Sequence, residues 1–162
     1  MGSKSGTLRV IMQSPDGSIA VDVPVQELAS DPDKLSAHLT RLQGMGYTLL
    51  KSDATGADLP NERGGQSRKF RNQWRWDGAK IEPDLPLCRE QVMAEVRAER
   101  DTRLAATDGE AVRNQERGQP DQALKDHRQA LRDFPTTVQA AVDALTDAAA
   151  LEAYAPAWPV RA

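Results

Sequence analysis

Hydrophobic residues repeat at helical spacing in the stretch 84–135, and this repeat predicts two helical arms joined by a turn. The clearest stripe recurs at three- and four-residue steps, as on one face of an α-helix. Its members are Ala123, Leu124, His127, Ala130, Leu131 and Phe134. The Gly-Gln-Pro sequence at 118–120 predicts a tight turn ahead of this arm. The pattern therefore predicts a helical hairpin, with a first arm over 86–117 and a second arm over 120–134 that ends before Pro135.

The two predicted arms differ in length. At about 1.5 Å per residue, the first arm would measure roughly 48 Å and the second roughly 22 Å. Val92, Met93 and Val96 then lie on the uncovered part of the first arm. Their burial would need the N-terminal unit, the aromatic residues near Trp74 or another chain. Gly109 leaves the continuity of the first arm open, because glycine inside a helix costs about 1 kcal/mol relative to alanine.

Residues 1–52 predict a small β-β-α-β unit. Two strand-like segments, 7–13 and 19–25, flank a turn that contains Pro and Asp-Gly, and residues 47–50 predict a third strand. Between them, a capping residue before proline and a stripe of leucines predict a short helix. These residues are Asp31, Pro32, Leu35, Leu39 and Leu42. Such a unit buries only about ten apolar residues, each contributing roughly 1.5–3 kcal/mol before chain entropy is subtracted, so it is marginal alone.

Residues 53–83 predict a linker followed by an aromatic and basic docking segment. Gly, Asp, Asn and Ser dominate the first part. The segment 70–76 reads Phe-Arg-Asn-Gln-Trp-Arg-Trp, and its aromatic spacings of four and two favour neither helix nor strand. After the hairpin, residues 136–162 predict a short helix and an extended tail docked on a surface. The helix is marked by Val138, Ala141, Val142 and Leu145, and the tail by Tyr154 and Trp158.

The predicted fold class is therefore α+β. A small N-terminal α/β unit with a β-hairpin is followed by a long helical hairpin and a short C-terminal helix, in an elongated molecule. Aromatic residues make up only 4% of the 162 residues and charged residues 28%. The apolar side chains are therefore concentrated in a few seams.

Charge and cysteine content narrow the function classes. The formal net charge of −3 argues against a dedicated nucleic-acid or membrane binder, since such domains usually carry a basic excess. The single Cys88 cannot form an intrachain disulfide, which fits a reducing cytoplasm. No apolar run approaches eighteen residues and no signal peptide is evident, so we expect a soluble protein.

No catalytic constellation, cofactor motif or metal site is predicted. His38 and His127 are far apart in the sequence, and neither is accompanied by spaced Cys or carboxylate ligands. His127 lies on the apolar stripe, where a packed core histidine is the simplest interpretation. The lone Cys88 is interpreted as a small core residue.

The aromatic and basic segment is open to three interpretations. Its cations are Arg63, Arg68, Lys69, Arg71 and Arg75, beside Phe70, Trp74 and Trp76. They could stack bases and neutralise phosphates, pack within the protein, or anchor a protein interface, where Trp and Arg are enriched. The acidic chain favours the protein interface. The candidate interface residues are Phe70, Arg71, Trp74, Arg75, Trp76, Val92, Met93, Val96, Tyr154 and Trp158.

The order of several sequence blocks carries a family resemblance. The most specific blocks are Phe-Arg-Asn-Gln-Trp at 70–74 and Arg-Gln-Ala-Leu-Arg-Asp-Phe-Pro at 128–135. With the blocks at 59–63, 84–86 and 96–100, they resemble a family of small tailed-bacteriophage proteins, the tail assembly or tail-fibre-associated proteins. The likeness covers most of the chain from about Leu59 onward. This sequence departs from the family pattern by the insertion of residues 64–69 and by Gly109 in the predicted first arm.

The resemblance implies a non-enzymatic role in building or attaching the phage tail. The implied partner is a tail fibre or baseplate protein, with a homo-oligomer possible and neither nucleic acid nor membrane as a partner. The implied location is the virion tail after synthesis in the host cytoplasm. We favour a retained virion component that connects or stabilises the fibre. The alternatives are an assembly chaperone that leaves the particle and a generic helical-hairpin adaptor.

Overall fold

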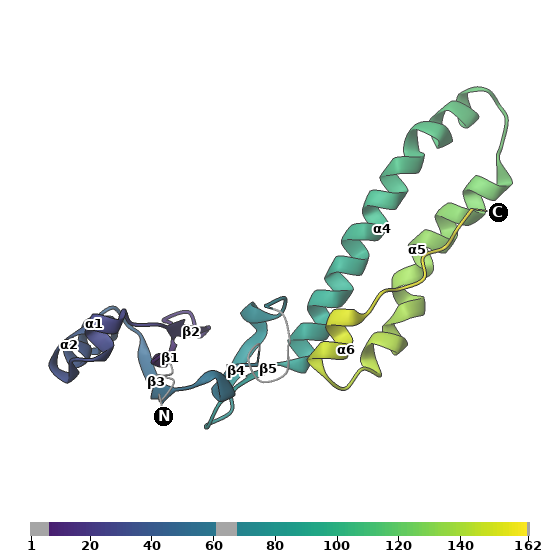
Figure 1. The fold of residues 1–162 in the computed structure, drawn as a ribbon. Coiled ribbons are helices and arrows are strands. Elements are labelled where there is room, and N and C mark those ends of the chain that lie inside the picture. Colours follow the sequence, from purple (N-terminus) through teal and green to yellow (C-terminus); the bar gives the residue numbers. More distant parts are fainter. Residues whose placement is uncertain (1–6, 61–67, 162) are drawn as a thin grey trace. The chain divides into compact units, whose positions relative to one another are not determined.

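The computed structural model describes residues 7–60 and 68–161, and the chain divides into two compact units (Figure 1). The units span Met1–Asp84 and Leu85–Ala162. Small antiparallel sheets come first, and long helices with a short C-terminal helix follow. The predicted α+β class is therefore confirmed. Among the described helices, none combines the length and the apolar character needed to cross a membrane.

The N-terminal unit is built on a three-stranded sheet in the order β2-β1-β3, with both neighbouring pairs antiparallel. The strands are β1 (Arg9–Gln13), β2 (Ile19–Asp22) and β3 (Thr48–Ala54). The predicted hairpin between the first two strands is confirmed. Gly17 takes a φ of 87° in its turn, and Asp16 Oδ1 accepts a hydrogen bond from Ser18 N at 2.9 Å. Because β1 is the central strand, its residues Val10, Ile11 and Met12 are fully buried.

Two helices, α1 (Gln26–Ala29) and α2 (Pro32–Gly44), separate β2 from β3. The predicted start of α2 is confirmed, since Asp31 Oδ1 accepts hydrogen bonds from Asp33 N at 3.1 Å and Lys34 N at 3.2 Å. The leucine stripe of α2, interpreted from the sequence as its buried face, is only half-buried. A hydrogen bond of 2.8 Å between His38 Nε2 and Asp22 Oδ2 ties α2 to β2.

The aromatic segment that the sequence left unassigned forms a 3₁₀ turn and a short hairpin. The turn η2 spans Arg71–Gln73, and β4 (Trp74–Trp76) pairs antiparallel with β5 (Ile81–Pro83). Asp77 Oδ1 accepts hydrogen bonds from Ala79 N and Lys80 N, both at 2.8 Å, and so fixes the connecting turn. The hairpin adds Ile81 to a buried cluster with Ile11, Ala54 and Leu59.

A partly buried ion pair closes the loop after β3. Thr55 and Asp58 form a capping box over η1 (Gly56–Asp58), in which Thr55 N donates to Asp58 Oδ2 at 2.7 Å. Lys51 Nζ donates to Asp58 Oδ1 at 2.8 Å. The hydrogen bonds from Lys51 and Thr55 lower the pKa of Asp58, and the hydrogen bond to Asp58 raises the pKa of Lys51.

These shifts predict a pH dependence of the N-terminal unit. The stabilisation by Asp58 is complete above its ordinary pKa of 3.8 and is lost as the pH falls through the lower folded value. Asp58→Asn should therefore lower the urea midpoint at pH 7, and the difference from the wild type should narrow below pH 3.8. Hydrogen exchange in β3 during urea titration measures this. Asp53→Asn, an exposed aspartate of the same strand, should have a smaller effect at both pH values; equal effects would contradict the prediction.

The helical unit contains α4 (Leu85–Glu116), α5 (Gln122–Asp143) and α6 (Ala148–Ala153). The helix α4 runs unbroken through Gly109, which settles the continuity that the sequence left open. The helix ends at the predicted turn, where Gly118 takes a φ of 62°. There Gln119 N donates to Asn114 O at 3.0 Å and Gly118 N donates to Gln115 O at 3.1 Å. This pair of hydrogen bonds is the Schellman motif that ends many helices at glycine.

The prediction that Pro135 ends the second arm is wrong. The helix α5 continues through this residue to Asp143, so the short helix expected around Val138 and Val142 is part of α5. A proline inside a helix costs about 3 kcal/mol. Each buried Val or Met side chain contributes roughly 1.5–3 kcal/mol, and both valines are buried in the continued helix. Burial along the seam with α4 therefore outweighs the proline penalty.

The expectation that the first arm overhangs the second is wrong for the same reason. Val92, Met93 and Val96 are 3%, 2% and 5% exposed. Arg89 Nη2 donates to Leu145 O at 2.7 Å, so the continued α5 and the turn after it reach the first turns of α4. The helix α6 also packs against α4. The chain itself covers these three side chains, and they need no outside partner.

Candidate protein-binding groove at the tip of the helical hairpin

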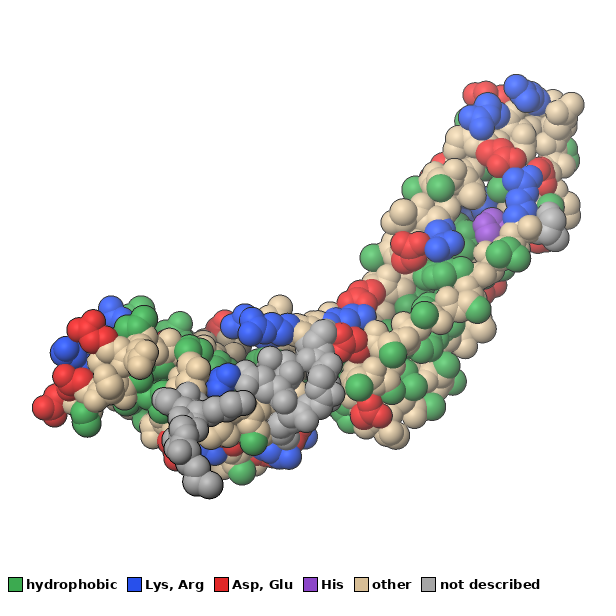
Figure 2. Space-filling view, viewed as in Figure 1, with side chains coloured by type: hydrophobic (Ala, Val, Ile, Leu, Met, Phe, Trp, Pro, Cys, Tyr) green, Lys and Arg blue, Asp and Glu red, His purple; other side chains and the backbone are tan. Residues whose placement is uncertain are grey.

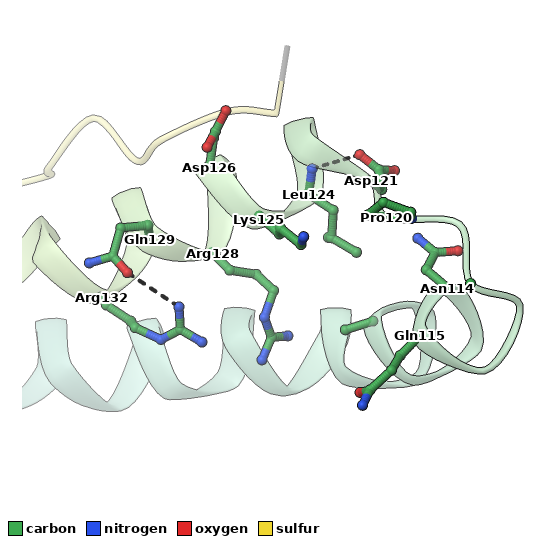
Figure 3. A pocket seen from close by; sticks show the side chains of 12 residues that line it. Asn114, Gln115, Pro120, Asp121, Leu124, Lys125, Asp126, Arg128, Gln129 and Arg132 are labelled. Carbon is green, nitrogen blue, oxygen red and sulfur yellow. Dashed lines mark hydrogen bonds between the residues drawn. The ribbon is translucent and has the colours of Figure 1, made fainter.

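A groove opens between α4 and α5 near the turn that joins them (Figure 3). Its volume is about 680 Å³. Its lining combines small and apolar residues with polar and charged side chains. The residues are Ala111, Asn114, Gln115, Gly118, Pro120, Asp121, Leu124, Lys125, Asp126, Arg128, Gln129 and Arg132. In the space-filling view, charged side chains gather at this tip of the helical unit, while hydrophobic ones are more common towards its base (Figure 2).

Arg128 fixes the spacing of the two helices at the groove. Its guanidinium donates from Nη1 to Leu104 O at 3.2 Å and to Thr107 Oγ1. Its Nη2 also pairs with Asp108 Oδ1 at 2.8 Å. The side chain is 17% exposed. A single arginine of α5 thus holds three groups of α4, and charge-assisted hydrogen bonds of this kind are among the stronger polar contacts.

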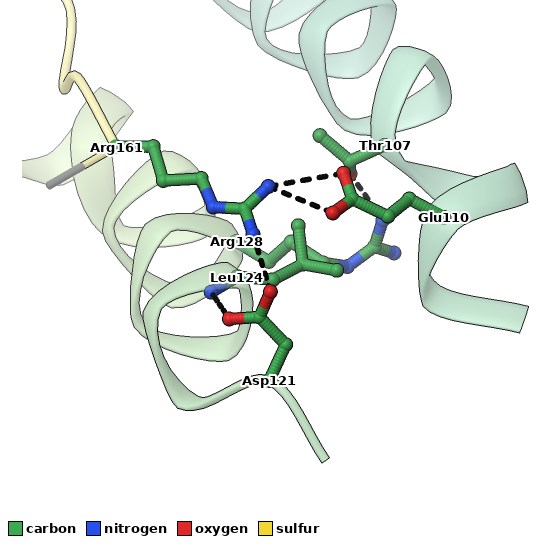
Figure 4. A network of polar contacts seen from close by, with 6 residues as sticks. All are labelled: Thr107, Glu110, Asp121, Leu124, Arg128 and Arg161. Carbon is green, nitrogen blue, oxygen red and sulfur yellow. Dashed lines mark hydrogen bonds and ion pairs between the residues drawn. The ribbon is translucent and has the colours of Figure 1, made fainter. Parts of the chain in front are cut away.

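A second polar network lies at the start of α5 (Figure 4). Asp121 caps the helix, since its Oδ1 accepts from Leu124 N at 2.9 Å. Its Oδ2 accepts from Arg161 Nη2 in the C-terminal tail. Arg161 Nη1 donates to the two oxygens of Glu110 on α4, at 2.9 and 3.0 Å. The hydrogen bonds to Glu110, and to a lesser extent the contact with Asp121, raise the pKa of Arg161. Through Arg161 the tail bridges both helices.

Trp158 docks the same tail on the hairpin. Its ring centroid lies 4.4 Å from that of Phe134, at a tilt of 36°. The guanidinium carbon of Arg103 on α4 lies 4.6 Å from the Trp158 ring centroid, within the range of cation–π attraction. The extended tail predicted from the sequence is therefore docked on its own helices. None of the tail residues that the structure describes lines the groove.

Two cations of the groove are available for a ligand. Lys125 and Arg132 are both exposed, and within residues 7–60 and 68–161 neither forms an ion pair with the chain. Arg132 Nη1 makes only a long hydrogen bond of 3.5 Å to Gln129 Oε1. Of the groove carboxylates, Asp121 is bound by Arg161 and Asp126 Oδ1 accepts from Gln122 Nε2 at 2.6 Å.

The candidate residues of the aromatic segment are divided between core and surface. Phe70 is 4% exposed, and Trp74 and Trp76 are half-buried against the cluster of the N-terminal unit. Arg71 and Arg75 are exposed. Much of this segment therefore packs internally, with its arginines left at the surface. Arg63 lies outside the described residues.

A small pocket of about 230 Å³ brings part of the aromatic segment together with other residues of the N-terminal unit. Its lining is Arg9, Val21, Val23, Leu59, Arg68, Arg71 and Trp74. The remaining candidates lie in the helical unit. There Tyr154 is half-buried, Trp158 is docked on Phe134, and the three residues of α4 are in the core. The structure thus places the candidate set in two separate units.

The groove residues were missed by the sequence interpretation. The available signal was the row of cations at positions 125, 128 and 132 on α5, whose spacing of three and four places them on one helix face. Within the described part of the chain, no group of three or more His, Cys, Asp and Glu side chains is placed to hold a metal ion. The helical unit is a hairpin module with an open groove and a docked tail.

Comparison with known proteins identifies this module. Residues 93–160 match the family model described as phage tail assembly chaperone protein. The matched range covers most of the helical unit, including both helices at the groove and the docked tail as far as Val160. Over these residues the module is phage tail assembly chaperone-like, which confirms the family resemblance drawn from the sequence for this part of the chain. The blocks at 59–63, 70–74 and 84–86 lie outside the matched range. No curated protein and no solved structure matches the chain.

Proposed function

We propose that this protein is a non-enzymatic phage tail assembly chaperone that binds a tail fibre or baseplate polypeptide and leaves it when assembly is complete. The family match of the helical unit is the observation that carries this proposal. The open groove at the hairpin tip supports it, because it combines apolar surface with a charged rim. Interfaces that form and dissociate are more polar than permanent ones.

The burial of Val92, Met93 and Val96 supports release over permanent attachment. Apolar helix surface left bare by the chain would need a neighbour that stays, since a chaperone that departs would expose it again. These side chains are covered by the chain itself. A retained component that connects or stabilises the fibre is the second candidate, and the same family match is compatible with it.

Two measurements on the same phage test the proposal. The full chain is co-expressed with each tail fibre and baseplate protein in turn, and captured partners are identified by pull-down. Gradient-purified particles are then analysed by mass spectrometry. We expect capture of a tail protein and absence of the chaperone from particles. Stoichiometric presence in particles would establish the retained component instead, and capture of no tail protein would overturn both.

The surface around Arg71, Trp74 and Arg75 remains a proposed second contact for the tail protein. Exposed arginines beside an aromatic ring are typical of binding surfaces. The same pull-down with Arg75→Ala tests this contact, since the exposed side chain can be removed without opening the core. Undiminished capture would exclude Arg75 from the interface.

A further inference from the structure

We infer that the groove at the hairpin tip takes an acidic amphipathic helix from the bound polypeptide. The inference rests on the proposed function for the source of that helix, and on the groove itself for its chemistry. The groove lies between two helices that are held apart near their turn, so its long direction follows the helix axes (Figure 3). A third helix laid along this seam is a common way of filling such a space.

The inner surface of the groove suits apolar side chains at close range. Leu124 is 3% exposed and lies in the lining with the small residue Ala111. Gly118 and Pro120 line the end at the turn. Small residues let a neighbouring backbone approach closely, so leucine-sized side chains of a bound helix can reach the space between α4 and α5. An amphipathic helix presents such side chains along one face.

The positive charges at the rim of the groove favour a negatively charged partner. Lys125 and Arg132 are seven positions apart on α5, which places them on the same helix face about 10 Å apart at 1.5 Å per residue. Arg128 lies between them but is committed to Asp108. Of the two groove carboxylates, Asp121 is paired with Arg161. Asp126 forms no ion pair with the described residues, so the two available cations outnumber the one available carboxylate. Carboxylates two turns apart on a bound helix would match these cations.

The way the C-terminal tail binds to the hairpin supports this choice of site. The chain's own tail already occupies the neighbouring part of the α4–α5 seam, with Trp158 on Phe134. It meets the groove at one edge, where Arg161 lies between Glu110 and the groove residue Asp121. This tail shows that the two helices accept an added segment that has an apolar anchor and a charged end. The groove stays open beside the tail, since none of residues 154–161 lines it.

A peptide-binding experiment on the full chain tests the inference. The probe is a fluorescein-labelled helical peptide of about 16 residues, long enough for four turns, with leucines at three- and four-residue spacing and glutamates two turns apart. The comparison peptide has glutamine at each glutamate position. We expect the acidic peptide to bind about tenfold more tightly than the glutamine peptide, and the difference to shrink in high salt.

Charge reversal in the groove locates the binding site. The double variant Lys125→Glu with Arg132→Glu should weaken binding of the acidic peptide by about tenfold or more. The matched control reverses two exposed cations outside the groove, Lys34→Glu with Arg97→Glu, and should bind within about twofold of the wild type. Circular dichroism checks that both variants fold. Absence of binding by the wild type, or equal binding by the groove variant, would overturn the inference.

Analytical ultracentrifugation without peptide tests the competing occupant of the groove, a second copy of this chain. If the wild type self-associates and the groove variant does not, a second copy of this chain fills the groove and the inference fails. The co-expression assay separates the two proposals. Capture of a tail protein by both wild type and groove variant would overturn the groove assignment alone. Peptide binding without capture of any tail protein would overturn the proposed function alone.

Discussion

Leu131→Ala is expected to lower the free energy of unfolding of the helical unit by about 3 kcal/mol. Leu131 is 0% exposed in the middle of α5. It belongs to the buried stripe that includes Leu124 and Val138, each seven positions away. Truncation removes apolar burial and leaves a cavity in a seam where the helices are fixed on both sides, so the site cannot collapse to refill it.

The effect of Leu131→Ala is measured by urea unfolding with hydrogen exchange in residues 122–143 as the local readout. Val112→Ala is the matched control, because Val112 is 53% exposed on α4. Its replacement removes little buried surface and favours the helix slightly, so we expect a change of less than about 0.5 kcal/mol. Similar losses in both variants would mean that the α4–α5 seam does not determine the stability of this unit.

Local sequence signals were sufficient for the elements that are fixed by nearby residues. Asp31 before Pro32 predicted the start of α2, and the apolar stripe through Leu131 predicted the buried face of α5. The Gly-Gln-Pro sequence at 118–120 predicted the turn, which forms through the positive φ of Gly118. Each of these depends on groups within a few positions of one another, so its physical cause is visible in the sequence.

Whether the helix continues through Pro135 depends on residues far away in the sequence. The rule that proline ends a helix describes the cost of one lost hydrogen bond and one steric clash. It does not include Val138 and Val142 packing on a seam with α4, which only the folded hairpin provides. The error then spread to Val92 and Val96, because a shorter second arm leaves the first one bare. The wrong end of one helix thus produced a wrong conclusion about the exposure of the other.

The aromatic segment and the groove were beyond sequence reasoning for different reasons. The strand β4 has only three residues, Trp74–Trp76, so it is too short to show the alternation of apolar and polar residues that predicts a strand. Its conformation is set by pairing with β5. The groove depends on the distance between two helices, which Arg128 sets through Leu104, Thr107 and Asp108. No spacing in a single helix reports that distance.

Trp158→Ala is expected to release the C-terminal tail from the hairpin and to lower the stability of the helical unit by about 2 kcal/mol. The ring packs on Phe134 and receives the guanidinium of Arg103. An aromatic pair contributes about 0.5–1.5 kcal/mol beyond its buried area, and partial burial of the ring adds to this. Hydrogen exchange in the tail and in residues 122–143 measures both effects.

Arg161→Ala on the same tail separates the contributions of aromatic and ionic contacts. Arg161 bridges Glu110 and Asp121 at a site where its side chain is 35% exposed. Exposed ion pairs typically contribute about 0–1 kcal/mol, less in salt, so this variant should have the smaller effect and the stronger salt dependence. If Trp158 is the anchor, the double variant should lose little more than Trp158→Ala alone, since a detached tail cannot hold Arg161 in place. Fully additive losses would instead show that the two contacts hold the tail independently, and a tail still protected in Trp158→Ala would assign the docking to Arg161.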